Sequence, residues 1–124
     1  MRDLTDHITN AANDRITVTV MDDPGAGNAN HVYRAHWPFM EGQGIAGELE
    51  IHFQNGPIAD CGVNGVTQEV LLAIVIDWLR SFQAGPYGCR ENGLALTKCE
   101  EALMWLQKRT VARLARGVEG TSAV

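Results

Sequence analysis

Hydrophobic positions with helical spacing dominate the last third of the chain. Apolar residues recur between Val70 and Phe82 at the spacing of a broad helical stripe, and Gly85 and Pro86 interrupt it. A second unbroken segment runs from about Cys89 to Arg116, and Gly117 suits its C-terminal cap. This pattern predicts a helical hairpin over residues 67–117, with Thr67 as an N-cap. At a rise of about 1.5 Å per residue the second helix would span roughly 40 Å. We therefore expect part of it to contact another subunit.

The first half alternates between apolar and polar residues, as β-strands do. Strands are predicted at residues 16–21, 31–37 and 48–54, separated by a turn-rich loop at 22–30 and a glycine-rich loop at 41–47. Leu49, Ile51 and Phe53 share one face of the third strand, which indicates an antiparallel sheet with one face buried. Residues 3–14 are polar, with at most one short helical turn. The predicted class is α+β, a small antiparallel sheet packed on a long C-terminal helical hairpin.

Length, charge and cysteine content limit the domain organisation and the classes of function that the chain can have. A chain of 124 residues is expected to form one domain, divided into a β-rich part (1–66), the hairpin (67–117) and a tail (118–124). A net charge of −5 argues against general nucleic-acid binding. We expect no signal peptide and no membrane span, because no apolar run approaches about 20 residues. Three cysteines without a CxxC pair fit reduced thiols in a cytoplasm.

Motifs for catalysis or metal binding are weak. Residues 42–47 spell GxGxxG, but a predicted strand follows them where the dinucleotide fingerprint requires a helix. Four histidines lack the close spacing of metal ligands, and no serine or cysteine has the context of a nucleophile. We therefore predict no catalytic residues, no metal site and no cofactor.

The turn of the hairpin brings together groups that could recognise a base. Phe82 ends the first helix, while Arg90, Glu91 and Asn92 begin the second. An aromatic ring can stack on a base, and an amide can read its polar edge. The spacing alone favours a structural explanation, with Phe82 in the core and the others as solvated or capping groups.

Arginines gather near the end of the second helix. Arg109, Arg113 and Arg116 lie four and three residues apart, on one helical face. The helix dipole favours cations at this end, which is a sufficient structural explanation. The same stripe could also bind phosphate.

Three stretches of the second half resemble one family. These are GPIADCGVNGVTQEVLLAIVIDWLRSFQAGPYGCREN, LALTKCEEALMWLQKRT and RGVEGT, between about Gly56 and Thr121. They are similar to phage anti-Thoeris signal sponges, the first Thoeris anti-defence family, and the second helix resembles the hairpin shared with anti-CBASS sponges. Residues 1–55 match only in general character.

The resemblance implies a non-catalytic phage protein that acts in the cytoplasm of the infected bacterial host. Such proteins bind a glycocyclic ADP-ribose type of signal made by a TIR-domain sensor and withhold it from its effector. They form homodimers with pockets shared between protomers, and some members form hexamers, as trimers of dimers, that also hold cyclic trinucleotides. The residues implied for the ligand are Phe82 and Asn92 for the base and Arg109 and Arg113 for phosphate or ribose, with Arg90 and His7 as weaker additions.

Two other functions stay open at this point. One is an enzyme that degrades a cyclic nucleotide signal; the binding of cyclic di- or trinucleotides would be an extension of the sponge itself. The other is an assembly protein that uses the hairpin only for contacts between subunits.

Overall fold

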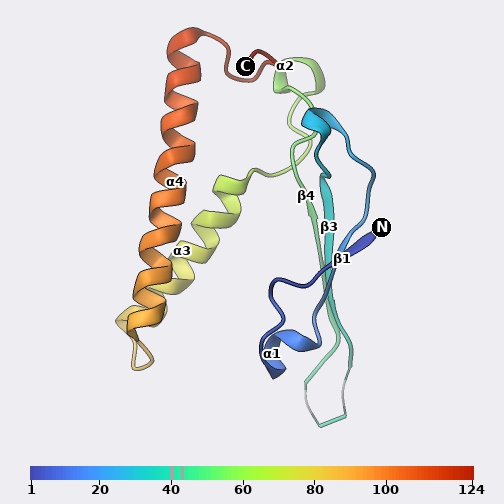
Figure 1. Ribbon diagram of the computed structural model, residues 1–124, viewed down its shortest axis with the longest axis vertical. Helices are drawn as coiled ribbons and strands as arrows, with labels where there is room; N and C mark the ends of the chain where they lie inside the picture. Colours follow the sequence, from blue (N-terminus) through green and yellow to red (C-terminus); the bar gives the residue numbers. More distant parts are fainter. Residues whose placement is uncertain (40, 43) are drawn as a thin grey trace. The chain divides into compact units, whose positions relative to one another are not determined.

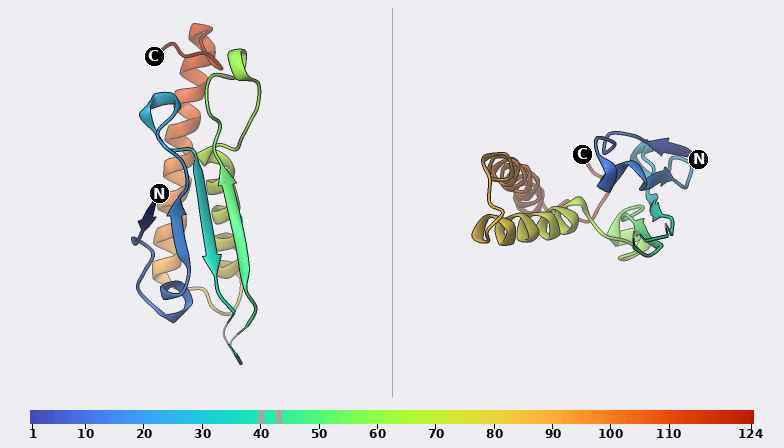
Figure 2. Two further views of the ribbon diagram at one scale, coloured as in Figure 1. Left: turned by 90° about the vertical axis from the view of Figure 1, so that its right-hand side faces the viewer. Right: turned by 90° about the horizontal axis from the view of Figure 1, so that it is seen from below.

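Four antiparallel strands form a sheet in the order β1-β2-β3-β4 in the first part of the chain (Figures 1 and 2). Their bounds are Arg2–Leu4 for β1, Thr17–Val20 for β2, Val32–Trp37 for β3 and Gly47–His52 for β4. Strands β2, β3 and β4 confirm the three predicted strands, with ends that differ by at most two residues. The α+β class is likewise confirmed.

The strand register separates an apolar from a polar face. Val18, Ala35 and Leu49 lie directly opposite one another across β2, β3 and β4. The neighbouring row of Thr19, Arg34 and Glu50 points to the other face, because successive side chains of a strand alternate. Leu49 is 53% exposed, so the apolar face is less covered than the alternation predicted.

Close packing at the end of the sheet requires a glycine. Trp37 lies opposite Gly47, and its indole covers the glycine backbone. A Cβ at position 47 would lie 2.1 Å from Cζ2 of Trp37, which no side chain could occupy without displacing the ring. Deeper in the sheet, the rings of Tyr33 and Phe53 meet edge to face at 5.6 Å between centroids.

Short elements near the sheet were only partly expected. Strand β1 and the one-turn helix α2 (Ile58–Cys61) were not predicted, because three or four residues carry too little periodicity to be recognised. The expected helical turn near the N-terminus is α1 (Ala11–Asp14), and the predicted loop at 22–30 contains the 3₁₀ turn η1 (Ala26–Asn28).

The structure, a computed structural model, describes residues 1–39, 41–42 and 44–124, and its contacts divide them into the units Met1–Gly65 and Val66–Val124. Each unit is described by itself. The single domain over 1–124, and the packing of sheet on hairpin, stay predictions. Gln43 of the GxGxxG sequence lies outside the described residues, and β4 begins at Gly47, where the dinucleotide fingerprint would need a helix.

The second unit is the predicted helical hairpin. Helix α3 spans Gln68–Ala84 and helix α4 spans Arg90–Arg116, so α4 continues well beyond the start of α3 (Figure 1). Thr67 caps α3 by accepting a hydrogen bond at 3.4 Å from the Val70 N–H, as predicted. Gly117 ends α4 with a left-handed φ of 72°, as its sequence position indicated.

Contacts along the hairpin hold the two helices together. Ile76 on α3 is 3% exposed, which makes it the most buried residue of the two helices. Arg80 of α3 donates to Glu100 of α4 at 2.8 Å. Among the described residues, neither helix has the length and continuous apolarity that a membrane span requires.

Candidate functional site

A glutamine fixes the turn between α3 and α4. The side chain of Gln83 donates to the Cys89 carbonyl at 3.0 Å and accepts from the Cys89 N–H at 2.9 Å. The Cys89 sulfur in turn accepts from the backbone N–H of Asn92 at 3.4 Å and caps α4. These contacts hold the last turn of α3 next to the first turn of α4, which places Phe82 and Asn92 at the same end of the hairpin.

Phe82 and Asn92 line one cavity of about 350 Å³. The other lining residues are apolar: Val75, Trp78 and Leu79, all from α3. The rings of Trp78 and Phe82 lie 5.8 Å apart between centroids and are inclined by 54°. Trp78 is 65% exposed and Phe82 is 39% exposed, so both rings present surface that a planar ligand could cover.

The side chain of Asn92 provides the polar part of this cavity. Its backbone N–H is used in the cap, whereas its carboxamide has no hydrogen-bond partner in the described part of the chain. A carboxamide offers donors and an acceptor together, which suits the polar edge of a nucleobase. Arg90, the first residue of α4, is exposed and does not line this cavity.

Arg109 is separated from this cavity by most of α4. Positions 92 and 109 of the same helix are 17 residues apart, which corresponds to about 25 Å along its axis. Arg109 is exposed. A single hairpin therefore does not bring Phe82 and Asn92 together with the distal arginines.

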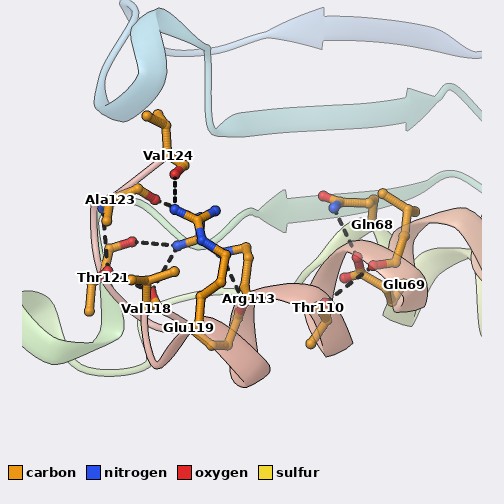
Figure 3. Close-up of polar contacts among 11 residues, drawn as sticks. Gln68, Glu69, Thr110, Arg113, Val118, Glu119, Thr121, Ala123 and Val124 are labelled. Atoms are coloured by element: carbon orange, nitrogen blue, oxygen red, sulfur yellow. Dashed lines mark hydrogen bonds and ion pairs between the residues drawn. The ribbon is translucent and has the colours of Figure 1, made fainter.

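Arg113 lies near the C-terminal end of α4 and is 7% exposed (Figure 3). Its guanidinium donates to the Glu119 carboxylate at 3.0 Å and to carbonyl oxygens of the following segment. Its neighbour Arg116 donates to the Val124 carbonyl at 2.6 Å. The arginine predicted to bind phosphate thus has acceptors from its own chain, which its spacing in the sequence did not indicate.

His7 belongs to the first unit. Its ring nitrogen Nε2 lies 2.6 Å from the Ile16 carbonyl oxygen, and the side chain is half-buried. This contact joins the segment after β1 to the start of β2. The role of His7 in ligand binding stays a prediction.

Asp22 organises the end of the sheet opposite the glycine-rich loop. Its carboxylate accepts from the backbone N–H groups of His31 (2.9 Å) and Val32 (3.1 Å). Burial acts to raise the pKa of Asp22, but these hydrogen bonds favour the carboxylate and hold its pKa below the ordinary value. No group of three His, Cys, Asp or Glu residues suited to a metal ion occurs within the described residues.

Trp78 is the cavity residue that sequence reasoning missed as a ligand contact. It lies four residues before Phe82, so the two rings must share one face of α3. That spacing could have identified it, but a tryptophan in an apolar helical stripe is more often part of a core.

Comparison with known proteins agrees with this architecture. The family described as "Acb2/Tad1, hairpin domain" matches residues 46–111, which covers β4 and most of the hairpin. The chain is also 56% identical over 78 residues to "Thoeris anti-defense 1" of Bacillus phage SBSphiJ7. That match covers 62% of this chain and 55% of the relative, so the chain spans about half the length of the curated relative. The chain therefore belongs to the Acb2/Tad1 hairpin-domain family.

Proposed function

We propose that this protein sequesters, without cleaving it, a cyclic ADP-ribose isomer made by TIR-domain immune sensors. By withholding the signal in the cytoplasm of the infected bacterial host, it would block activation of the effector. The observation that carries the proposal is that Phe82 and Asn92, which belong to different helices, line the same cavity.

The cavity suits the adenine end of such a ligand. Stacking of a base on an aromatic side chain contributes about 1–3 kcal/mol, and the Trp78 and Phe82 rings both offer exposed faces. The Asn92 carboxamide can then bind the polar edge of the stacked base. A volume of about 350 Å³ is at the lower end for small-molecule pockets and leaves the rest of the ligand outside.

The phosphates of the ligand require cations that one hairpin places about 25 Å away. A second copy of the chain, related by a two-fold axis, could bring its own Arg109 and Arg113 to the cavity of the first. The proposed unit is therefore a homodimer in which each site takes residues from both protomers. A hexamer built from three such dimers, and binding of cyclic di- or trinucleotides, belong to the same proposal.

Sequestration without chemistry fits the lining of the cavity. Four of its five residues are apolar, and the fifth is an amide, which is neither a general base nor a nucleophile. Binding between rigid helices needs little ordering of the protein, which favours affinity.

The test is calorimetric titration with cyclic ADP-ribose isomers and cyclic di- and trinucleotides, followed by chromatography of the recovered ligand. We expect submicromolar binding, recovery of unchanged ligand, and a roughly 10- to 100-fold loss of affinity in Phe82→Ala. Phe39→Ala is the matched control, because Phe39 is 64% exposed and lies in the first unit. Recovery of altered ligand would identify an enzyme instead. No binding to any of these ligands would leave the assembly protein as the explanation.

A further inference from the structure

The segment after α4 encloses the guanidinium of Arg113. Besides Glu119, three backbone carbonyls accept hydrogen bonds from it at 2.6, 2.9 and 3.1 Å (Figure 3). These carbonyls belong to Ala123, Val118 and Thr121. Four of the acceptors that a buried guanidinium requires thus come from residues 118–124, which we call the 118–124 segment.

The sequence RGVEGT explains why the segment folds in this way. Gly117 and Gly120 adopt left-handed φ values of 72° and 81°, which other residues rarely adopt. Between them the Val118 N–H donates to the Arg113 carbonyl at 3.1 Å and completes the helix cap. The Thr121 hydroxyl donates to the Val118 carbonyl at 2.5 Å. The motif therefore turns the chain back so that its oxygens face the end of α4.

The oxygens around Arg113 resemble those that a phosphate group would offer. A guanidinium is a planar fork of donors that binds carboxylate and phosphate oxygens alike. Here a carboxylate supplies the negative charge and the carbonyls supply the remaining acceptors. Glu119 keeps a side-chain exposure of 34%, against 9% for Arg113, so the carboxylate lies on the solvent side of the pair.

We propose that the 118–124 segment occupies the anion site of Arg113 in the free protein and is displaced by the phosphate of the bound ligand. This inference rests on the proposed function, because it assigns a regulator to the same site. The Glu119 carboxylate leaves the guanidinium, and a phosphate oxygen takes its place. The affinity for the ligand is then set partly by how tightly Glu119 holds Arg113.

Removal of the charge at position 119 should tighten ligand binding. Glu119→Gln keeps the size of the side chain but lowers its attraction for the guanidinium, so we expect a roughly threefold to tenfold gain in affinity. A gain in affinity would distinguish displacement of the 118–124 segment from simple damage to the fold, because damage to the fold would weaken binding. Glu101→Gln is the matched control, since Glu101 lies on α4 and pairs with Lys98 at 3.6 Å, away from Arg113.

Hydrogen exchange measured by mass spectrometry provides a second, independent readout. The amides of Val118 and Thr121 are hydrogen-bonded within the cap and the segment, so displacement should accelerate their exchange. We expect this acceleration when the wild-type protein is saturated with the cyclic ADP-ribose isomer or with inorganic pyrophosphate. Slower exchange, or unchanged or weaker binding by Glu119→Gln, would overturn the inference.

The pyrophosphate arm separates failure of this inference from failure of the proposed function. If no cyclic nucleotide binds, the proposed function is wrong, and pyrophosphate alone decides whether Arg113 exchanges its acceptors. If pyrophosphate accelerates hydrogen exchange of the Val118 and Thr121 amides, the displacement of the 118–124 segment from Arg113 is supported. If it leaves their hydrogen exchange unchanged, the displacement is refuted. If the cyclic nucleotide binds without accelerating hydrogen exchange of these amides, the proposed function stands and only the displacement of the 118–124 segment is refuted.

Discussion

The distance between the two ends of α4 leads to the prediction that each ligand site takes residues from two chains. This prediction holds whichever base the ligand carries. Asn92 and Arg109 lie about 25 Å apart along one helix, which exceeds the reach of a dinucleotide-sized ligand folded into a ring. If both contact the ligand, they must come from different chains. Two variants that each weaken binding should then complement each other when mixed.

The amount of recovered binding follows from random pairing. Phe82→Ala and Arg109→Ala chains, mixed in equal amounts and allowed to exchange, give about half mixed dimers. Each mixed dimer has one site with both changes and one site with neither. About one quarter of all sites are therefore intact.

The assay is the stoichiometry of binding by calorimetry after the two variants are unfolded together and refolded. We expect about 0.25 ligand per chain with the affinity of the wild-type protein. Each variant refolded alone is the control and should contain no site with the affinity of the wild-type protein. If the mixture also contains no site of wild-type affinity while exchange of chains is demonstrated by mass, the two-chain site is refuted.

Three further predictions concern stability, each measured by urea unfolding. Gly47→Ala should cost about 1–3 kcal/mol, because its Cβ would lie 2.1 Å from the Trp37 ring. Ile76→Ala should cost about 2–5 kcal/mol, since Ile76 is 3% exposed, whereas Ile45→Ala, at a side chain that is 81% exposed, should change stability by less than about 0.5 kcal/mol. The pKa of Asp22 is lowered by folding, so its contribution is present above the ordinary value of 3.8 and is lost as the pH falls through the folded pKa. Asp22→Asn should therefore destabilise the protein at pH 7 and flatten the fall in stability below pH 3.8.

Each of these three stability predictions has a result that would contradict it. Unchanged stability of Gly47→Ala would mean that the indole moves aside without cost. Equal losses in Ile76→Ala and Ile45→Ala would show that the burial of Ile76 does not contribute to stability. A pH profile of Asp22→Asn identical to that of the wild type would show that the backbone hydrogen bonds to the carboxylate do not stabilise the fold.

Local signals in the sequence determined most of the secondary structure. Thr67 and Gly117 end the hairpin helices because a hydroxyl can cap an N-terminus and glycine can adopt a left-handed φ. Strands β2 to β4 follow from alternation, since one face of an antiparallel sheet is apolar. The proximity of Phe82 to Asn92 also followed from sequence, because the connection between α3 and α4 is only five residues long.

Only the tertiary structure decided which of these residues line one cavity and what else they contact. Spacing put Arg109 and Arg113 on one helical face, but it could not show that Arg113 is buried by a segment five to ten residues later. It also could not show that Trp78 and Phe82 line a cavity instead of packing in a core. Periodicity reports the direction of a side chain relative to its own helix, whereas partners from other segments depend on how the whole chain folds.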